Sequence, residues 1–137
     1  MDWKLELIVV PVTDVDRAKA FYTDQTDFNC DVDHRAGEDF RVVQLTPRGS
    51  KCSIALMRNA DKAGTLEGLH LVVPDIEAAR AELVARGTEM SEPFHFGETG
   101  QTPGLDPNRA DYGTFATFSD PDGNVWLVQE VRSQSSS

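Results

Sequence analysis

Two halves of the chain follow the same order of sequence patterns, and this internal repeat constrains the fold more than any other feature. The first part of each half reads LELIVVPVTDVDRAKAFY at residues 5–22 and EGLHLVVPDIEAARAEL at residues 67–83. Each begins with an apolar run typical of a β-strand, passes a proline and an aspartate, and continues with apolar residues at helical spacing. Asp14 and Asp75 stand where a short carboxylate caps a helix N-terminus.

The second part of each half is also alike, because two short β-rich runs flank a turn of proline, glycine and small polar residues. One further strand is expected in each half, near Asp31 and at residues 92–96. The repeat therefore predicts an α+β fold of tandem βαβββ modules that form a curved mixed sheet around a cleft. The runs and turns are residues 40–45, 47–50 and 52–56 in the first half, and 114–118, 120–124 and 125–129 in the second.

We expect a single domain over residues 1–132, with halves at about 3–60 and 66–132, and a disordered tail at 133–137. One helix covers only one face of its sheet, so the other face of each half needs a partner or a ligand. Two curved sheets that face one another would enclose a small-molecule cleft. Two unrelated α+β modules with similar patterns are the alternative reading of the repeat.

Composition narrows the class of protein. The chain has 137 residues and a net charge of −10, which argues against nucleic-acid binding, since that requires clustered lysine and arginine. No targeting segment and no apolar run long enough for a membrane helix is visible, so we expect a cytoplasmic protein that contacts neither nucleic acid nor membrane. Cys30 and Cys52 show no metal-binding spacing and are expected to be reduced thiols.

Three stretches resemble the vicinal oxygen chelate superfamily, which includes glyoxalase, extradiol dioxygenases and bleomycin-resistance proteins. They are the two repeats quoted above and FSDPDGNVWLVQE near the end, of which the Asp-Pro-Asp-Gly-Asn run is the most specific. The likeness covers roughly residues 3–131. It implies a homodimer and, for the enzymes of the family, a divalent metal held by one residue from each of four strands.

The four positions that correspond to the family's metal ligands hold residues that ligate poorly. They are Leu7, seven residues before Asp14, Leu69, six before Asp75, and Leu127, four after Gly123. The fourth is Ala55, or Ser53 if the preceding turn is counted differently. Divalent cations need carboxylate, imidazole or thiolate donors, so we expect no family metal and no cofactor. By strand alternation, His70 is expected to point away from the cleft, toward the helix layer. A non-standard site built from His34 and His95 stays an open alternative.

The same alternation predicts which side chains line the cleft and which pack under the helices. Core positions are expected at Ile8, Val10, Ile54, Leu56, Trp126 and Val128. The cleft would be mostly aliphatic with a few hydrogen-bonding groups, as binding pockets are; a closed second hydrophobic core is the alternative. The cleft-facing candidates are Leu5, Leu7, Val9, Ser53, Ala55, Met57, Leu69, Leu71, Val73, Leu127 and Gln129.

Two further groups could contact a ligand. Trp3, Phe94, His95 and Phe96 lie at strand ends or beside a long loop, whereas most other aromatic side chains are expected in the core. Residues 97–111 form the least regular stretch and could act as a lid. Arg109 and Tyr112 would then lie over the cleft mouth; alternatively, Arg109 pairs with Asp106 or Asp111 in a surface loop.

No nucleophile motif, phosphate-binding loop or dinucleotide fingerprint is present, and Glu6, His95, Glu98 and Tyr112 show no acid–base pairing. The sequence therefore favours a metal-independent protein that sequesters a hydrophobic or planar compound, and it leans away from an enzyme. A lyase, isomerase or dioxygenase-like enzyme, with an unusual metal site or none, is the first alternative. A non-catalytic dimeric accessory module with a closed cleft is the second.

Overall fold

The structure is a computed structural model, and it describes residues 1–133. The chain forms two compact units. Among the described residues, unit 1 contains 1–66 together with 120–124, and unit 2 contains 67–119 together with 125–133. Of the predicted tail, Ser133 donates its backbone N–H to Asp111 at 3.1 Å, and residues 134–137 lie outside the described part.

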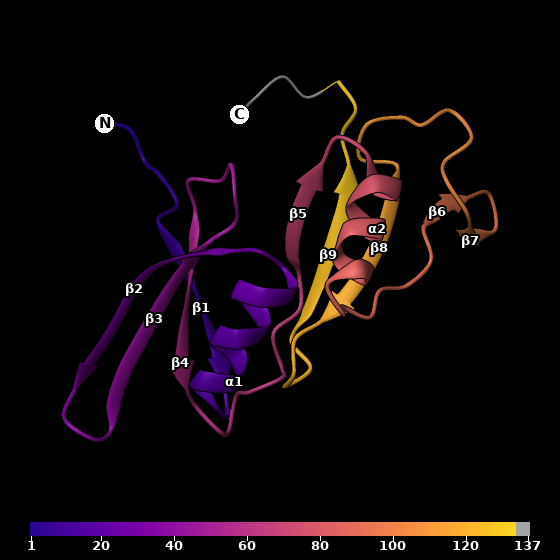
Figure 1. The fold of residues 1–137 in the computed structure, drawn as a ribbon. Helices are drawn as coiled ribbons and strands as arrows, with labels where there is room; N and C mark the ends of the chain where they lie inside the picture. The colour runs from indigo at the N-terminus through magenta and orange to yellow at the C-terminus, as the bar shows by residue number, and fades with distance from the viewer. Residues whose placement is uncertain (134–137) are drawn as a thin grey trace. The chain divides into compact units, whose positions relative to one another are not determined.

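Unit 1 is a four-stranded mixed sheet with one helix (Figure 1). The strands lie in the order β1-β4-β3-β2; β1 is parallel to β4, and the other neighbours are antiparallel. After six α-helical residues the helix continues as a short π-helical turn. The elements are β1 (Leu7–Val12), α1 (Val15–Ala20), η1 (Phe21–Gln25), β2 (Asn29–Ala36), β3 (Phe40–Thr46) and β4 (Ser53–Arg58).

The sequence signals for α1 act as expected. The Asp14 carboxylate accepts a hydrogen bond from the Arg17 N–H at 3.1 Å, which satisfies one of the unpaired donors of the first turn. Val15 and Ala18 are buried on the face of α1 that packs on the sheet, next to Tyr22 from η1. The core of unit 1 therefore lies between α1–η1 and one face of the sheet.

Unit 2 is a five-stranded mixed sheet with one longer helix. Its strands lie in the order β5-β9-β8-β6-β7; β5 is parallel to β9, and the remaining neighbours are antiparallel. Asp75 accepts hydrogen bonds from the N–H groups of Glu77 and Ala78, both at 3.1 Å, and so caps α2. The elements are β5 (Leu69–Val73), α2 (Ile76–Ala85), β6 (Phe94–Gly97), β7 (Gly100–Pro103), β8 (Thr114–Ser119) and β9 (Val125–Glu130).

The predicted α+β class and the strand–helix–strands order of each half are confirmed. The structure differs in having an additional strand, β7, inside the stretch expected to be irregular. Gly97 pairs with Gly100 and closes a tight hairpin, and the positive φ of Gly100 (104°) suits glycine. Pro103 is tolerated because β7 is an edge strand.

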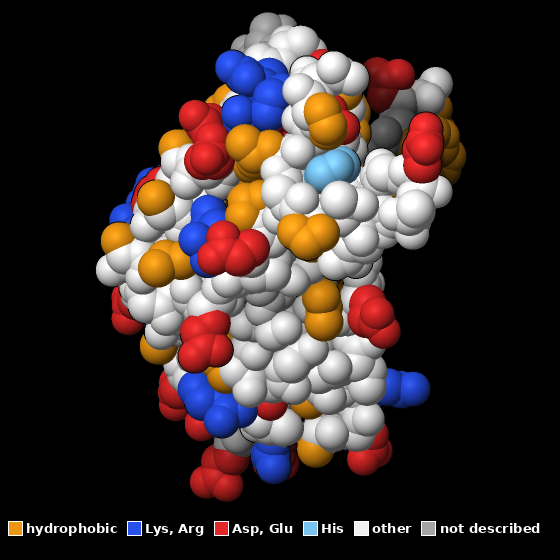
Figure 2. Space-filling model, turned by 90° about the vertical axis from the view of Figure 1, so that its right-hand side faces the viewer, with side chains coloured by type: hydrophobic (Ala, Val, Ile, Leu, Met, Phe, Trp, Pro, Cys, Tyr) orange, Lys and Arg blue, Asp and Glu red, His pale blue; other side chains and the backbone are white. Residues whose placement is uncertain are grey.

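No helix within residues 1–133 is long and apolar enough to cross a membrane. On the molecular face shown in Figure 2, which is the side where α2, β6 and β7 are drawn in Figure 1, acidic and basic side chains are interspersed and hydrophobic side chains form separate small spots. Such scattered apolar exposure is ordinary for a soluble surface, so this view shows no extended apolar patch.

Candidate functional site

The five-stranded sheet of unit 2 has one face covered by α2 and one face that no element of unit 2 covers within the described residues. Side chains of register partners in neighbouring strands point to the same face. Trp126 and Val128 are buried on the α2 side, and Leu69 pairs with Trp126 in register. His70 pairs with Leu127 instead, so both lie on the opposite, helix-free face.

This register corrects the sequence prediction for β5. Leu69, Leu71 and Val73 were expected to share a face with Leu127 and Gln129, and they lie on the opposite face. Leu7 lies seven residues before its helix cap, Asp14, whereas Leu69 lies only six residues before Asp75, and a shift of one residue exchanges the two faces of a strand. Counting seven residues from the cap reaches Gly68, which has no side chain to offer.

His70 was expected to point toward the helix layer, and this prediction is also wrong. Its side chain is exposed on the helix-free face, and its Nδ1 lies 2.9 Å from the Oε1 of Gln129. Because an amide oxygen only accepts hydrogen bonds, the His70 ring carries its proton on Nδ1 in this contact. In this tautomer the lone pair of the neutral ring lies on Nε2.

Three phenylalanines form an aromatic cluster on the same face. Phe94 and Phe115 are register partners whose rings stack at a centroid distance of 5.7 Å. The ring of Phe96 meets that of Phe115 edge-on at 5.3 Å and that of Phe94 at 6.0 Å. Phe96 is 61% exposed. The cluster therefore offers an accessible aromatic surface that is held in place by its own edge-to-face and stacked contacts.

The cluster and the histidine belong to one continuous surface. Phe115 is the register partner of Gln129, and Gln129 is the register partner of Val72. One row of side chains therefore crosses four strands from β5 to β6. We call this surface the open face; its residues are His70, Val72, Phe94, Phe96, Phe115, Thr117, Leu127 and Gln129. These eight side chains include no carboxylate, amine or thiol.

Sequence reasoning predicted part of the open face and missed the rest. Phe94, Phe96, Leu127 and Gln129 were among the candidates, whereas His70, Val72, Phe115 and Thr117 were not. The signal that would have found Phe115 is the turn at residues 120–124, because a hairpin turn sets which residues of its two strands face one another.

In unit 1, alternation gave the correct grouping. Leu7 is the register partner of Ser53, and Val9 of Ala55, so the four share the face opposite α1, with Met57 on the same side. Trp3 and Leu5 precede β1 and are exposed. Contact of any of these residues with a ligand stays a prediction.

The residues at the family's metal positions do not suit a divalent cation. Leu7 and Leu127 have no donor atom, and the Ser53 hydroxyl is engaged with the Thr46 hydroxyl at 2.7 Å. Within the described part of the chain, no three His, Cys, Asp or Glu side chains are grouped so that they could hold a metal ion.

Arg109 fulfils neither of its two predicted roles. Its guanidinium donates to Glu130 at 2.8 Å from Nε and at 2.5 Å from Nη2, and its Nη1 lies 3.6 Å from Glu77. Glu130 is fully buried on the α2 side and also accepts the N–H of Ile76, the first residue of α2, at 3.0 Å. The Arg109 hydrogen bonds outweigh burial and hold the pKa of Glu130 below its ordinary value.

The neighbours of Arg109 also have structural contacts. Asp106 accepts the N–H of Ala110 at 2.9 Å, and Asp111 accepts that of Arg132 at 2.8 Å. Tyr112 is exposed and adopts a positive φ of 63°. His95 is buried, with its Nδ1 2.8 Å from the carbonyl oxygen of Gly104. Within unit 2, Arg109 and His95 therefore secure the segment after β7.

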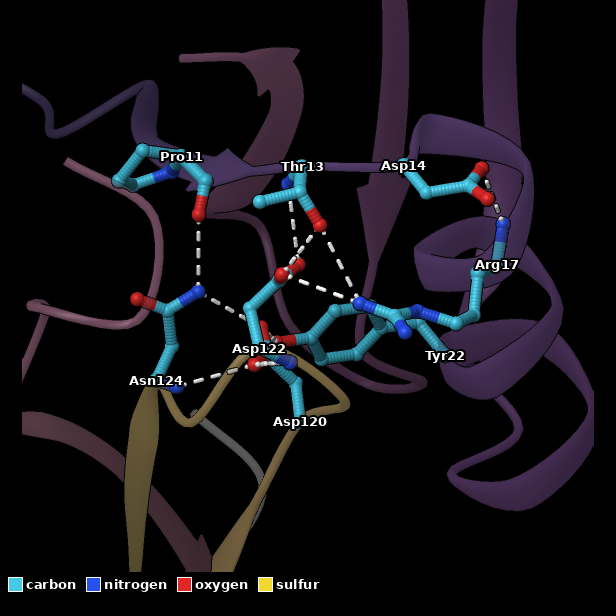
Figure 3. A network of polar contacts seen from close by, with 8 residues as sticks. All are labelled: Pro11, Thr13, Asp14, Arg17, Tyr22, Asp120, Asp122 and Asn124. Atoms are coloured by element: carbon cyan, nitrogen blue, oxygen red, sulfur yellow. Dashed lines mark hydrogen bonds and ion pairs between the residues drawn. The ribbon is translucent and has the colours of Figure 1, made fainter. Parts of the chain in front are cut away.

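The Asp-Pro-Asp-Gly-Asn run joins β8 to β9 but packs within unit 1 (Figure 3). Asp122 accepts hydrogen bonds from the Thr13 backbone N–H at 3.1 Å and from its hydroxyl at 2.6 Å, and its carboxylate lies 3.1 Å from the Arg17 guanidinium. These contacts hold the turn against the start of α1.

Asp120 and Asn124, which are both buried, form the rest of this hydrogen-bond network. The Tyr22 hydroxyl donates to Asp120 at 2.8 Å, and the Asn124 amide nitrogen donates to both Asp120 (2.8 Å) and the Pro11 carbonyl oxygen (2.9 Å). Every polar side chain of the run that is described here has a partner in the protein. The most specific motif of the sequence therefore has a structural role, since it joins the β8–β9 turn to the start of α1.

Comparison with known proteins agrees with this architecture. The family model described as Glyoxalase/Bleomycin resistance protein/Dioxygenase superfamily matches residues 4–128, which is most of the chain. The chain belongs to this superfamily.

Solved structures that match this chain include two from Streptomyces sp. CB03234. TnmS3, an antibiotic binding protein, is 30% identical with a TM-score of 0.75, and the match covers 95% of this chain and 97% of that one. A glyoxalase/bleomycin resistance protein is 32% identical with a TM-score of 0.70, over 93% and 100% of the two chains. The uncharacterized protein YetH of Bacillus subtilis (strain 168) is 28% identical over 90% of this chain and 94% of its own length.

Proposed function

We propose that this superfamily member binds a planar, hydrophobic small molecule on the open face of unit 2, without a metal ion, and thereby sequesters it. The observation that carries the proposal is the aromatic cluster of Phe94, Phe96 and Phe115, with Phe96 61% exposed. Removing a large aromatic side chain from water is favourable in free energy, and a flat ligand stacked on the exposed Phe96 ring would bury part of its surface.

The chemistry of the open face supports binding rather than bond making. Its side chains offer stacking surface, aliphatic contact and a few hydrogen-bonding groups, the mixture typical of small-molecule sites. The likeness to TnmS3, an antibiotic binding protein, supports a ligand of the antibiotic type. Sequestration of such a compound needs only affinity, so a site without acid–base groups or a metal suffices.

Pyrene, a fluorescent planar hydrocarbon, is a direct probe. Its fluorescence anisotropy should rise on binding the wild-type protein, and its presence should raise the melting temperature. Phe96→Ala should weaken pyrene binding about three- to tenfold, because stacked aromatic contacts contribute about 0.5–1.5 kcal/mol beyond buried area. Phe40→Ala, which removes an exposed phenylalanine from unit 1, is the matched control and should leave the affinity unchanged.

Two outcomes would contradict the proposal. The first is equal pyrene affinity in wild type and Phe96→Ala, or no binding in either. The second is loss of pyrene binding after dialysis against EDTA, restored by adding a divalent metal, which would show that binding depends on an ion.

A further inference from the structure

We infer that His70 is a specificity-determining residue that accepts a hydrogen bond from an O–H group on the ligand, and that Gln129 positions the His70 ring for this contact. The inference rests on the proposed function, because it assigns the polar group of a ligand bound to the open face. The class of ligand that it selects is a planar aromatic compound with a hydroxyl group at one end, such as a phenol.

The hydrogen bond to Gln129 determines which tautomer the neutral His70 ring adopts. With the Nδ1 proton donated to the Gln129 Oε1 at 2.9 Å, the neutral imidazole keeps its lone pair on the remaining ring nitrogen, Nε2. His70 lies on the exposed surface of the sheet, so a ligand can reach this nitrogen. A neutral imidazole held in one tautomer accepts a hydrogen bond from a hydroxyl and offers nothing to a methyl ether at the same position.

The position of the pair matches one end of the aromatic surface. His70 is on β5, the edge strand of the sheet, and the phenylalanine cluster lies on β8 and β6. Neighbouring strands are about 4.8 Å apart, so β5 and β6 are separated by roughly 14 Å across three strand intervals. A fused-ring molecule lying over Phe115 and Gln129 therefore extends its edge toward His70.

The immediate neighbours of His70 make it the acceptor at this end. Its register partner is Leu127, and the next open-face residue along β5 is Val72, neither of which has a polar side chain. Across β9 the next position is Thr117, whose hydroxyl can act either as donor or as acceptor. At this edge of the open face, Nε2 of the neutral His70 ring therefore only accepts hydrogen bonds, whereas the Thr117 hydroxyl can also donate.

The test compares 1-hydroxypyrene with 1-methoxypyrene, which differ by the O–H group. Wild-type protein should bind 1-hydroxypyrene about three- to tenfold more tightly than 1-methoxypyrene, the effect of one neutral hydrogen bond. His70→Phe keeps a ring at the position and should bring the two affinities to within about twofold of one another. His34→Phe, which replaces an exposed histidine of unit 1, is the matched control and should keep the wild-type preference.

A substitution of Gln129 separates positioning from direct contact. Gln129→Met keeps His70 but removes the amide acceptor for Nδ1, and it should reduce the preference for 1-hydroxypyrene. A preference that survives in His70→Phe, or a wild-type preference for 1-methoxypyrene or for neither compound, overturns the inference.

The two proposals fail in different ways. If pyrene binds and Phe96→Ala weakens it, but His70→Phe leaves the hydroxyl preference unchanged, the inference is wrong and the proposed function stands. If none of the three pyrenes binds to the wild-type protein, both are wrong. Thermal unfolding of each variant shows that the fold is retained.

Discussion

The substitution Glu130→Gln tests whether the buried Arg109–Glu130 pair stabilises the fold. The Glu130 carboxylate is fully buried and accepts three hydrogen bonds, two from the Arg109 guanidinium and one from the Ile76 N–H. Hydrogen bonds to charged groups contribute about 1.5–3 kcal/mol and neutral ones about 0.5–1.5 kcal/mol, so Glu130→Gln loses about 1 kcal/mol per bond. The Arg109 side chain is 24% exposed and can regain water, which lowers the expected total to about 2 kcal/mol.

Urea unfolding at about pH 7 and about pH 3.5 measures this loss and its sign. The pKa of Glu130 is lowered in the folded state, so its contribution is present above the unfolded pKa of about 4.3 and is lost as the pH falls through the folded value. The glutamine introduced by Glu130→Gln does not titrate, so the gap between wild type and this variant should be widest at about pH 7 and narrower at about pH 3.5. Other carboxylates titrate alike in both proteins and cancel in the difference.

Glu77→Gln is the matched control, because Glu77 also approaches Arg109 but is largely exposed. This variant should change the free energy of unfolding by less than about 0.5 kcal/mol. A loss in Glu130→Gln below about 0.5 kcal/mol, or a gap that is equal at the two pH values, would refute the assignment of the buried pair as a stabilising charge contact.

Two further predictions concern the turn at residues 120–124. Tyr22→Phe removes the hydroxyl that donates to buried Asp120 and should lower the free energy of unfolding by about 1.5 kcal/mol, measured from urea midpoints at unchanged m-value; a change below about 0.3 kcal/mol would contradict the network in Figure 3. Gly64→Ala should cost clearly more than the control Gly49→Ala. Both glycines have a positive φ, at which an alanine costs about 1–2 kcal/mol. A Cβ at Gly64 would in addition lie 2.2 Å from the Asp122 carbonyl oxygen, whereas nothing lies within 4 Å of a Cβ at Gly49. Equal thermal stability of the two variants would show that this close approach is absent in solution.

Much of the fold could be predicted because its signals are local. The carboxylates of Asp14 and Asp75 cap their helices as their spacing indicated, since capping depends only on the next few residues. The strand–turn–strand patterns likewise depend on nearby residues. The hairpin that contains β7 was missed because the Gly-Glu-Thr-Gly turn suits a tight hairpin and an irregular loop equally well, and only pairing with β6 distinguishes them.

The candidate site was predicted less completely, because the face that a strand residue occupies is a matter of register. Leu69 and His70 are both compatible with a β-strand, and their residue types do not show which of the two side chains points toward α2. Arg109 had acidic neighbours on both sides in sequence, yet its partner is Glu130, twenty-one positions away. Such a pairing follows from how β9 and the preceding segment pack, which no local pattern encodes.

The sequence by itself determined the tandem α+β organisation, the two helix caps and the superfamily, because each depends on short-range patterns repeated in a recognisable order. Only the tertiary structure decided that His70, and not Leu69, lies on the open face with Phe115 and Gln129. The physical reason is that β-strand side chains alternate every residue, so one position of strand pairing, set by long-range hydrogen bonds, decides whether a side chain meets the core or a ligand.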